Sequence, residues 1–206
     1  MTHLNRLIPA LLVTLLMTGC ATRSLDATIP GERPTWKSQV KDIEALQRWT
    51  LAGKVGLRTP EESTSANLDW AQYPRYYRLL ISGPFGSGRN LMEGRPGRVS
   101  LTTSEGRFEA ETPEALMEQQ LGWSLPISAL DHWVRGLPAP GSEYTRNTDE
   151  SGYPLYLEQA GWEIDYRDWV ETQKGLWLPR RLVMTYGDLR ATLVVNQWRL
   201  GEAPDA

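Results

Sequence analysis

Residues 176–198 read LWLPRRLVMTYGDLRATLVVNQW and show the clearest strand pattern in the 206-residue chain. Apolar and polar residues alternate on both sides of the junction Tyr186-Gly187-Asp188-Leu189, and a period of two is typical of strands that bury one face. A glycine in a short junction between two such runs predicts a tight hairpin turn. We therefore expect two long antiparallel strands, at 176–186 and 189–198.

The rest of the chain is also rich in short alternating segments, which glycine and proline separate. Two regions show the three-to-four spacing of amphipathic helices instead: residues 36–48 carry one apolar stripe, and residues 112–136 hold two short helices. Thr112 can cap the first of these two, and Gly136 with Pro138 ends the second. The remaining expected strands are 49–59, 63–73, 75–82, 88–95, 97–103, 106–111, 142–149, 154–159 and 162–169.

This pattern of about eleven strands and three helices belongs to the α+β class. A flat sheet with this many strands would be unusual, because sheets twist and curl. Long antiparallel strands with few helices favour a barrel or half-barrel in which the helices cover one opening. The length of the chain suits a single domain with a full core.

The N-terminus, MTHLNRLIPALLVTLLMTGCATRS, is typical of an exported protein. Arg6 precedes an apolar stretch from Leu7 to Leu16, which has signal-peptide length and is shorter than the roughly 20 residues that cross a bilayer. Small residues then lead to Cys20, the only cysteine, in a pattern that resembles the lipobox of bacterial lipoproteins. A lone cysteine cannot form an internal disulfide. We expect residues 1–19 to be a removed signal peptide and Cys20 to carry the lipid; the alternative is an ordinary secretory signal before a chance cysteine.

The segment after the anchor reads as a tether. Residues 20–35 are polar and contain Pro30 and Pro34, so we expect a flexible linker there. Ala21 stands where, in the sorting rule of enteric-type bacteria, an aspartate would retain a lipoprotein in the inner membrane. This predicts an outer-membrane lipoprotein that faces the periplasm.

Charge and motifs exclude several classes of function. The net charge is −3, or −4 without residues 1–19, which argues against nucleic-acid binding. The chain contains no G-x-S-x-G, H-E-x-x-H, phosphate-binding glycine loop or Cys/His cluster. His132 beside Asp131 could act as a general base, but a half-buried or exposed helix histidine is the preferred interpretation. Alternation places Asp165 and Asp168 on opposite faces of a strand. We expect that the protein is not an enzyme and that it has no catalytic residue, metal or cofactor.

The apolar faces of the strands and helices are the remaining candidates for a site. They could fill a packed core, as most such stripes do, or a curved sheet could leave part of them lining a cavity, and periodicity does not separate the two. The candidate residues are Val55, Leu57, Leu68, Trp70, Leu79, Ile81, Leu116, Leu130, Trp133, Leu182, Met184, Leu193 and Val195.

The loop Ser82-Gly83-Pro84-Phe85-Gly86-Ser87-Gly88 joins two expected strands and puts an aromatic residue at a turn. Proline and glycines are typical of exposed turns, and loop tips are usually polar. Phe85 could fold back onto the core, or it could protrude into a membrane or a partner. The residues alone favour neither.

In their order along the chain, several motifs make the sequence similar to the LolB family of outer-membrane lipoprotein receptors. The resemblance spans nearly the whole chain. Its most specific parts are the G-P-F-G loop and W-S-L-P-I-S, which opens the last expected helix. The matching stretches are the lipobox at Cys20, WTLAGKVGLR (49–58), LDW (68–70), RLLISGPFGSG (78–88), WSLPISALDHWVRGLPAP (123–140) and LPRRL (178–182).

The resemblance implies an incomplete, half-open antiparallel barrel of eleven strands, with three helices as a lid over an apolar cavity, in a single acyl-binding domain over residues 36–201. It implies that the cavity takes acyl chains of client lipoproteins from the periplasmic carrier LolA, as a monomer and without nucleotide, and delivers them to outer-membrane phospholipid. Phe85 matches a family position that is usually leucine and helps membrane insertion, with Gly83, Pro84 and Gly86 forming its loop. The alternatives are a structural lipoprotein that acts as a protein-interaction module and a lipid-active enzyme.

Overall fold

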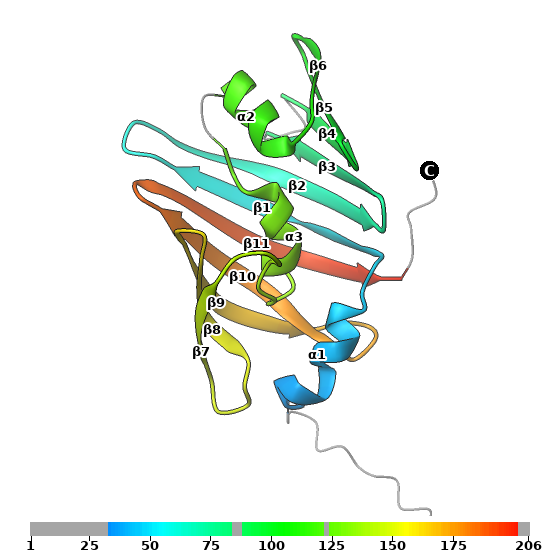
Figure 1. The fold of residues 1–206 in the computed structure, drawn as a ribbon, viewed down its shortest axis with the longest axis vertical. Coiled ribbons are helices and arrows are strands. Elements are labelled where there is room, and N and C mark those ends of the chain that lie inside the picture. The colour runs from blue at the N-terminus through cyan, green and yellow to red at the C-terminus, as the bar shows by residue number, and fades with distance from the viewer. Residues whose placement is uncertain (1–32, 84–87, 122–123, 202–206) are drawn as a thin grey trace, which may run out of the picture. The chain divides into compact units, whose positions relative to one another are not determined.

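The computed structural model describes residues 33–83, 88–121 and 124–201 (Figure 1). The chain divides into two compact units, Met1–Glu32 and Arg33–Ala206, and only the second contains described residues. Its elements, in chain order, are α1 (Trp36–Glu44), β1 (Trp49–Arg58), β2 (Ser63–Tyr73), β3 (Tyr76–Ser82), β4 (Asn90–Arg95), β5 (Arg98–Thr103), β6 (Gly106–Ala110), α2 (Pro113–Leu121), α3 (Ile127–Trp133), β7 (Tyr144–Thr148), β8 (Pro154–Gln159), β9 (Trp162–Glu171), β10 (Trp177–Tyr186) and β11 (Leu189–Leu200).

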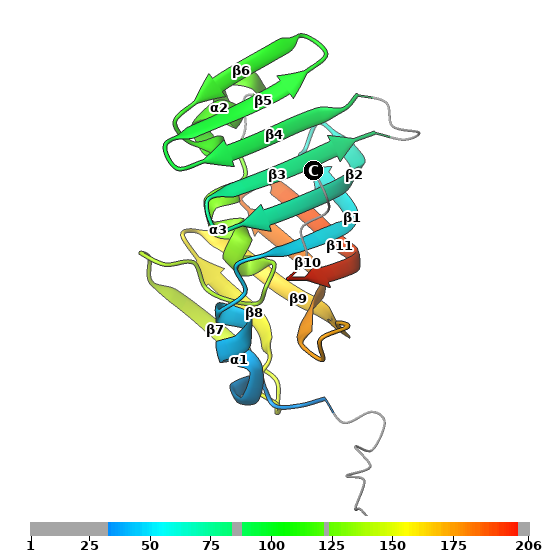
Figure 2. The same cartoon turned by 90° about the vertical axis from the view of Figure 1, so that its right-hand side faces the viewer.

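The strands form one antiparallel sheet in the order β6-β5-β4-β3-β2-β1-β11-β10-β9-β8-β7. Two meanders, β1 to β6 and β7 to β11, therefore meet where β1 pairs with β11. The two end strands of this order, β6 and β7, are not neighbours, so the sheet is unclosed (Figure 2). These observations confirm the predicted α+β half-barrel of eleven strands and three helices among the described residues.

The pairing of β1 with β11 depends on one glycine. Their register shifts between Ala52 and Gly53, because Ala52 pairs with Gln197 and Gly53 with Val195. The extra residue is a β-bulge, which bends one strand toward the other. A Cβ atom on Gly53 would lie 2.3 Å from the carbonyl oxygen of Val194. Only glycine leaves room for this close approach.

A second irregularity changes which residues of β9 face inward. The register between β9 and β10 shifts around Arg181, so that Asp168 pairs with Arg181 while Tyr166 pairs with Leu182. The bulge places Asp168 in solvent, where its carboxylate accepts a hydrogen bond from Arg180. The neighbouring Trp169 packs against the core instead. Simple alternation, which separated Asp165 from Asp168, fails at this bulge.

The helices are shorter than the sequence pattern suggests. The stripe at 36–48 gives nine helical residues, and the last expected helix ends at Trp133. The amide of Leu137 donates to the carbonyl of His132, and Gly136 has a φ of 80°, which is typical of a glycine that ends a helix. Thr112 caps α2 as expected, since its Oγ1 accepts a hydrogen bond from the amide of Ala115 at 3.2 Å.

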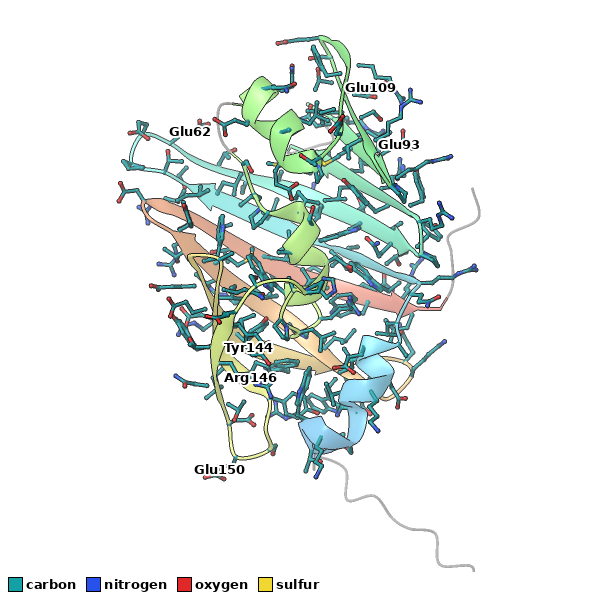
Figure 3. The ribbon with its side chains drawn as sticks, in the orientation of Figure 1. Glu62, Glu93, Glu109, Tyr144, Arg146 and Glu150 are labelled. Carbon is teal, nitrogen blue, oxygen red and sulfur yellow. The ribbon has the colours of Figure 1, made fainter. Side chains whose placement is uncertain are left out.

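The two faces of the sheet differ in polarity. Figures 1 and 2 show α2 and α3 over the same face, which we call the inner face, and its side chains form one continuous apolar cluster with those of the helices. The opposite, outer face is polar. Figure 3 shows Glu93 and Glu109 on the side of β4 to β6 that is away from α2. Glu109 pairs with Arg98 of the neighbouring β5, and Glu93 of β4 pairs with Arg107 of β6.

Candidate functional site

The thirteen apolar residues that the sequence singled out all belong to this inner cluster. Ten of them are no more than 6% exposed, and the other three, Val55, Leu57 and Ile81, are half-buried but pack against the rest. Leu116 of α2 and Leu130 of α3 bring the helices into the same cluster. The structure thus unites the proposed lining residues on one surface, and their contact with acyl chains stays a prediction.

The inner face is divided into rows by the strand register. Trp49 of β1 pairs with Gln72 of β2, and Gln72 pairs with Tyr77 of β3, which makes one polar and aromatic row at one end of these strands. Toward the other end of the strands, Val55 pairs with Leu193 of β11 and with Ala66 of β2. The inner face therefore changes from aromatic and polar to aliphatic along the strands.

Three tryptophans pack together near the polar end. The ring centroid of Trp49 lies 5.0 Å from that of Trp70 and 5.4 Å from that of Trp198. The indole N–H of Trp70 donates to Gln72 Oε1 at 3.1 Å, and that of Trp198 donates to the carbonyl of Pro179 at 3.0 Å. The indole N–H of Trp49 is buried and meets no acceptor among the described residues.

Tyr77 presents a second donor of this kind. Its ring lies directly over Gly94, where a Cβ atom would come within 2.1 Å of it. Its hydroxyl is buried and has no hydrogen-bond partner in the described part of the chain. Burial, and secondarily the nearby carboxylate of Glu114, raise the pKa of Tyr77, so the hydroxyl keeps its proton at neutral pH.

Helix α3 is held to the sheet by a buried glutamine. Gln159 of β8 is 2% exposed. Its Oε1 accepts hydrogen bonds from Trp133 Nε1 and from the amide of Ala139, each at 2.8 Å, and its Nε2 donates to the carbonyl of Ala139 at 2.7 Å. The hydroxyl of Tyr166 also donates to the carbonyl of Trp133. These bonds fix α3 and the segment after it to β8 and β9.

A buried arginine ties α3 to α1. Arg135 Nη1 donates to the carbonyl of Ile43 at 3.0 Å, and its Nε donates to the carbonyl of Asp131 at 3.0 Å. Gln39 of α1 is buried too, and its Oε1 accepts a hydrogen bond from the amide of Trp177 on β10. Helix α1 is thus held at both α3 and the sheet.

Helix α2 has a more exposed polar connection. Its buried side chains include Leu116 and Met117. Glu114 reaches α3, where its Oε1 accepts a hydrogen bond from the amide of Ser128 at 2.9 Å and its Oε2 one from the hydroxyl at 3.3 Å. Both of these bonds are solvent-exposed, and exposed polar contacts contribute little to stability. Helix α2 is therefore less firmly fastened than α3.

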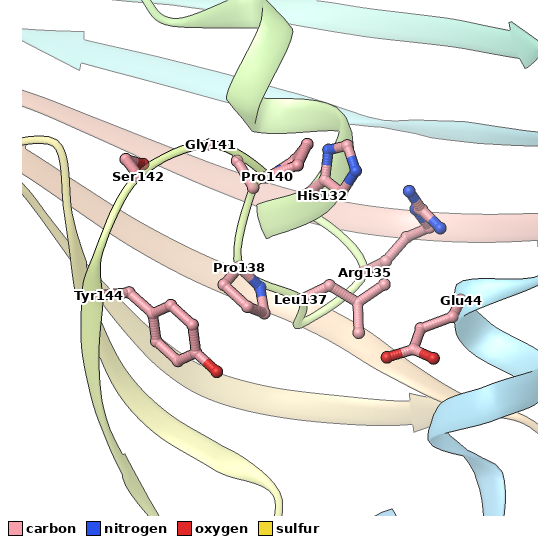
Figure 4. Close-up of a pocket in the computed structure, with 10 residues that line it drawn as sticks. Glu44, His132, Arg135, Leu137, Pro138, Pro140, Gly141, Ser142 and Tyr144 are labelled. Carbon is pink, nitrogen blue, oxygen red and sulfur yellow. The ribbon is translucent and has the colours of Figure 1, made fainter.

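A pocket of about 440 Å³ with a mixed polar and apolar lining lies beside α3, between α1, the segment that follows α3 and the start of β7 (Figure 4). Glu44, His132 and Arg135 line one side and Tyr144 another. His132 is half-buried as expected, with its Nδ1 3.8 Å from Asp131 Oδ2. Desolvation lowers the pKa of His132, although Asp131 opposes this shift. No nucleophile is hydrogen-bonded to His132 among the described residues, so the pocket lacks a base–nucleophile pair.

Within residues 33–83, 88–121 and 124–201, no three His, Cys, Asp or Glu side chains come together as metal ligands would. In the same residues, no helix has the length and hydropathy that crossing a bilayer requires.

Several predicted site residues fall outside the described residues, namely Cys20, Pro84, Phe85 and Gly86. Gly83 is described, and it directly follows β3 at the aliphatic end of the inner face. Sequence reasoning missed the buried polar residues Gln39, Arg135 and Gln159. Nothing in their local pattern marks them, because a buried glutamine or arginine looks like any surface residue until its partners are known.

Comparison with known proteins identifies the family. The family model described as "Outer membrane lipoprotein LolB" matches residues 47–198. An outer-membrane lipoprotein LolB from Chromohalobacter salexigens is 61% identical over 190 residues, covering 92% of this chain and 88% of the relative. The chain belongs to the LolB family. Another LolB, from Pseudomonas paraeruginosa, is 44% identical over 197 residues, covering 94% of this chain and 96% of the relative.

Solved structures support the fold of this LolB family member at much lower identity. A LolA superfamily protein from Nitrosomonas europaea has a TM-score of 0.51 at 10% identity, over 82% of this chain and 95% of that one. A DUF1329 family protein from Desulfovibrio piger has a TM-score of 0.53 at 7% identity, over 82% of this chain and 91% of that one. Both likenesses concern the fold alone.

Family membership confirms three predictions made from the sequence. The chain is an outer-membrane lipoprotein, it acts as a receptor in lipoprotein trafficking, and it is not an enzyme.

Proposed function

We propose that this protein accepts lipoproteins from the carrier LolA, holds their acyl chains against the apolar inner face and inserts them into the outer membrane. The observation that carries the proposal is the continuity of the inner cluster, which joins side chains of both meanders with those of the three helices.

The hydrogen bonds that hold each helix indicate which helix can move to open the site. Gln159 and Arg135 hold α3 through buried hydrogen bonds, whereas Glu114 holds α2 to α3 through exposed ones. Moving α2 breaks fewer buried polar contacts than moving α3, so α2 is the element that yields to an acyl chain. Leu116 and Met117 would then exchange their contacts with the core for contacts with the ligand.

The energetics require a gradient of affinity. Each buried methylene stabilises a complex by about 0.8 kcal/mol, so acyl chains bind any sufficiently large apolar surface. Directional transfer needs a receptor that binds the chains better than LolA and less well than the bilayer. Val55, Leu57 and Ile81 are half-buried in this structure, so a ligand would cover apolar surface that water now reaches.

We further propose that Cys20 carries the acyl anchor after removal of residues 1–19, and that residues 20–35 act as a tether. We also propose that Phe85 inserts into the periplasmic leaflet of the outer membrane, where the cargo is released. The last proposal rests on the bulk of phenylalanine at a loop that follows Gly83, at the aliphatic end of the inner face. Phospholipid of the outer membrane would be the final acceptor.

The deciding experiment follows a radiolabelled lipoprotein. Purified LolA loaded with the lipoprotein is mixed with the protein, and the label is located after separation of the two. Transfer of the label from LolA supports the proposal. If the label stays on LolA while the two proteins bind one another, the chain is a protein-interaction module instead.

A further inference from the structure

Two hydrogen-bond donors lie on the β1 and β3 part of the inner face without an acceptor among the described residues: the indole N–H of Trp49 and the hydroxyl of Tyr77. The indole N–H of Trp169, on β9 in the other meander, also lacks an acceptor there. A buried donor without an acceptor is unfavourable, and folded proteins avoid it almost everywhere. Trp70 and Trp198, which pack against Trp49, both have acceptors for their indole N–H groups. The missing acceptor is therefore specific to Trp49 and not general to this tryptophan cluster.

Both donors lie at the same level of the sheet. Trp49 pairs with Gln72, and Gln72 pairs with Tyr77, so one row crosses β1, β2 and β3. The row continues from Tyr77 to Gly94, Val99 and Ala110, and none of these residues carries a charge. The carboxylate of Glu114 is the charged group that acts on Tyr77.

The length of the inner face beyond this row suits an acyl chain. Ile81 lies four residues along β3 from Tyr77, and Gly83 lies six, which corresponds to about 13 and 20 Å at roughly 3.3 Å per residue. One leaflet of a bilayer holds its acyl chains in about 15 Å, half of the hydrocarbon thickness of about 30 Å. A chain whose polar end lies at Tyr77 would thus reach the aliphatic end of the face.

We infer that Trp49 and Tyr77 donate hydrogen bonds to the ester carbonyl oxygens of the client's diacylglyceryl group, and that the acyl chains run from there toward Gly83. This inference rests on the proposed function, because it assigns an orientation and a chemical class to the ligand of that same site. It explains why two donors are retained in an apolar interior. Each would gain its acceptor when the cargo binds.

Neutral ester carbonyls fit these donors better than an anion does. The indole N–H can only donate a hydrogen bond, and the hydroxyl of Tyr77 keeps its proton and can donate as well. A carbonyl oxygen can only accept, so it complements both groups. A buried phosphate or carboxylate would need an opposite charge beside it, and the nearby Glu114 has the wrong sign. The row therefore selects for uncharged acceptors.

The experiment compares two lipopeptides that differ only in their linkages. One carries two palmitoyl esters on a glyceryl-cysteine, and the other carries two hexadecyl ethers, which lack the carbonyl oxygens; both have a photoreactive diazirine at the chain ends. The mature, lipid-anchored protein in nanodiscs is irradiated with each, and the cross-linking yield is measured. Empty nanodiscs correct for the partition of each probe into lipid.

We expect wild-type protein to cross-link the ester probe at least about 5-fold better than the ether probe, because one hydrogen bond alone gives a ratio of about this size and the inference assigns two. Tyr77→Phe should lose most of this ratio without losing thermal stability, because it removes a hydroxyl that has no partner in the described structure. Trp49→Phe should lower the ratio as well. Tyr144→Phe, which changes an exposed tyrosine, should keep it. The cross-links should map near Val55, Leu57 and Ile81.

Two results would overturn the inference and leave the proposed function standing. The first is equal yields for both probes in wild-type protein, and the second is an unchanged ratio in both Tyr77→Phe and Trp49→Phe. Cross-links that map to the Trp49 end would refute the orientation. If neither probe cross-links above an unlipidated peptide, the acyl site itself is wrong, and the proposed function fails with it.

Discussion

The indole N–H of Trp133 donates to Gln159 Oε1 at 2.8 Å, and both side chains are buried. The same amide group of Gln159 also bonds both the N–H and the carbonyl of Ala139, so one side chain of the sheet satisfies three groups of the lid. A buried donor that loses its acceptor costs more than the bond itself contributes. Gln159 is therefore the polar residue on which the position of α3 depends most.

Replacing Gln159 with leucine should destabilise the fold strongly. Gln159→Leu leaves the indole N–H of Trp133 and the backbone of Ala139 without partners, and we expect the free energy of unfolding to fall by about 3 kcal/mol. Urea denaturation measures this loss. Gln197→Leu, on an exposed glutamine of β11, is the control and should change stability by less than about 0.5 kcal/mol. Equal effects of the two substitutions would contradict the role of Gln159.

Gly53 and Gly56 lie on the same strand and offer a matched pair. Gly53→Ala drives a methyl group against the carbonyl oxygen of Val194, so we expect a loss of about 2 kcal/mol or more, or separation of β1 from β11. For Gly56→Ala the nearest atom is 3.9 Å away, and little change in stability is expected. The melting temperatures of both variants test this difference. If Gly53→Ala melts at the wild-type temperature, the bulge tolerates a methyl group and the prediction is wrong.

The stability of the fold should depend on pH through His132. Desolvation lowers the pKa of His132 in the folded protein below the usual 6.5. The unfolded chain then binds the proton more readily, so stability is full above about pH 6.5 and declines as the pH falls below it. His132→Gln should remove this part of the pH dependence. The measurement is the free energy of unfolding from pH 5 to 8, and parallel curves for both proteins would rule out His132 as the cause.

Phe85→Glu tests the proposed insertion loop. A carboxylate does not enter the hydrocarbon region readily, whereas the acyl site is formed by other residues. We expect uptake of a lipoprotein from LolA to remain within about 2-fold of wild type and its transfer into liposomes to fall by 10-fold or more. Phe85→Leu, which keeps a large apolar side chain, should transfer normally. Unchanged transfer by Phe85→Glu would remove Phe85 from the mechanism.

Cys20→Ala tests the proposed anchor. Without the thiol no acyl group can be attached, so the protein should lose its membrane anchor while its unfolding midpoint in urea stays the same. Metabolic labelling with radioactive palmitate should mark wild-type protein and leave Cys20→Ala unlabelled. Palmitate incorporation into Cys20→Ala would show that the lipid is attached elsewhere.

The inner face could be predicted from the sequence because strands alternate with a fixed period. Leu193 and Val195 share parity with Leu189, and all three contact the core. The prediction fails where that period is broken. Beyond Val195 the next inward residue is Trp198 rather than Gln197, because the bulge adds one residue to β11. Nothing in the local sequence marks a bulge, since it arises from the fit between two strands that are distant in the chain.

The polar part of the site could not be predicted for a related reason. Gln159, Arg135 and Tyr77 owe their roles to partners on other elements, and helix or strand periodicity reports only which face a residue occupies. Helix lengths were overestimated because an apolar stripe can continue past the last helical turn. Leu46 still packs against the core although α1 ends at Glu44.

The pairing of Trp49 with Leu200 has a consequence for how the protein acquires its structure. The two meanders are built largely from neighbours in sequence, but the seam between them joins residues about 150 positions apart. Pairings of such long range are slow to form, because the entropy of loop closure is lost before contacts compensate for it. Until β11 is available to pair with β1, the first meander keeps its apolar side uncovered. Formation of the β1–β11 pairing, which completes the inner face, is thus also the step before which the folding chain is most prone to aggregation.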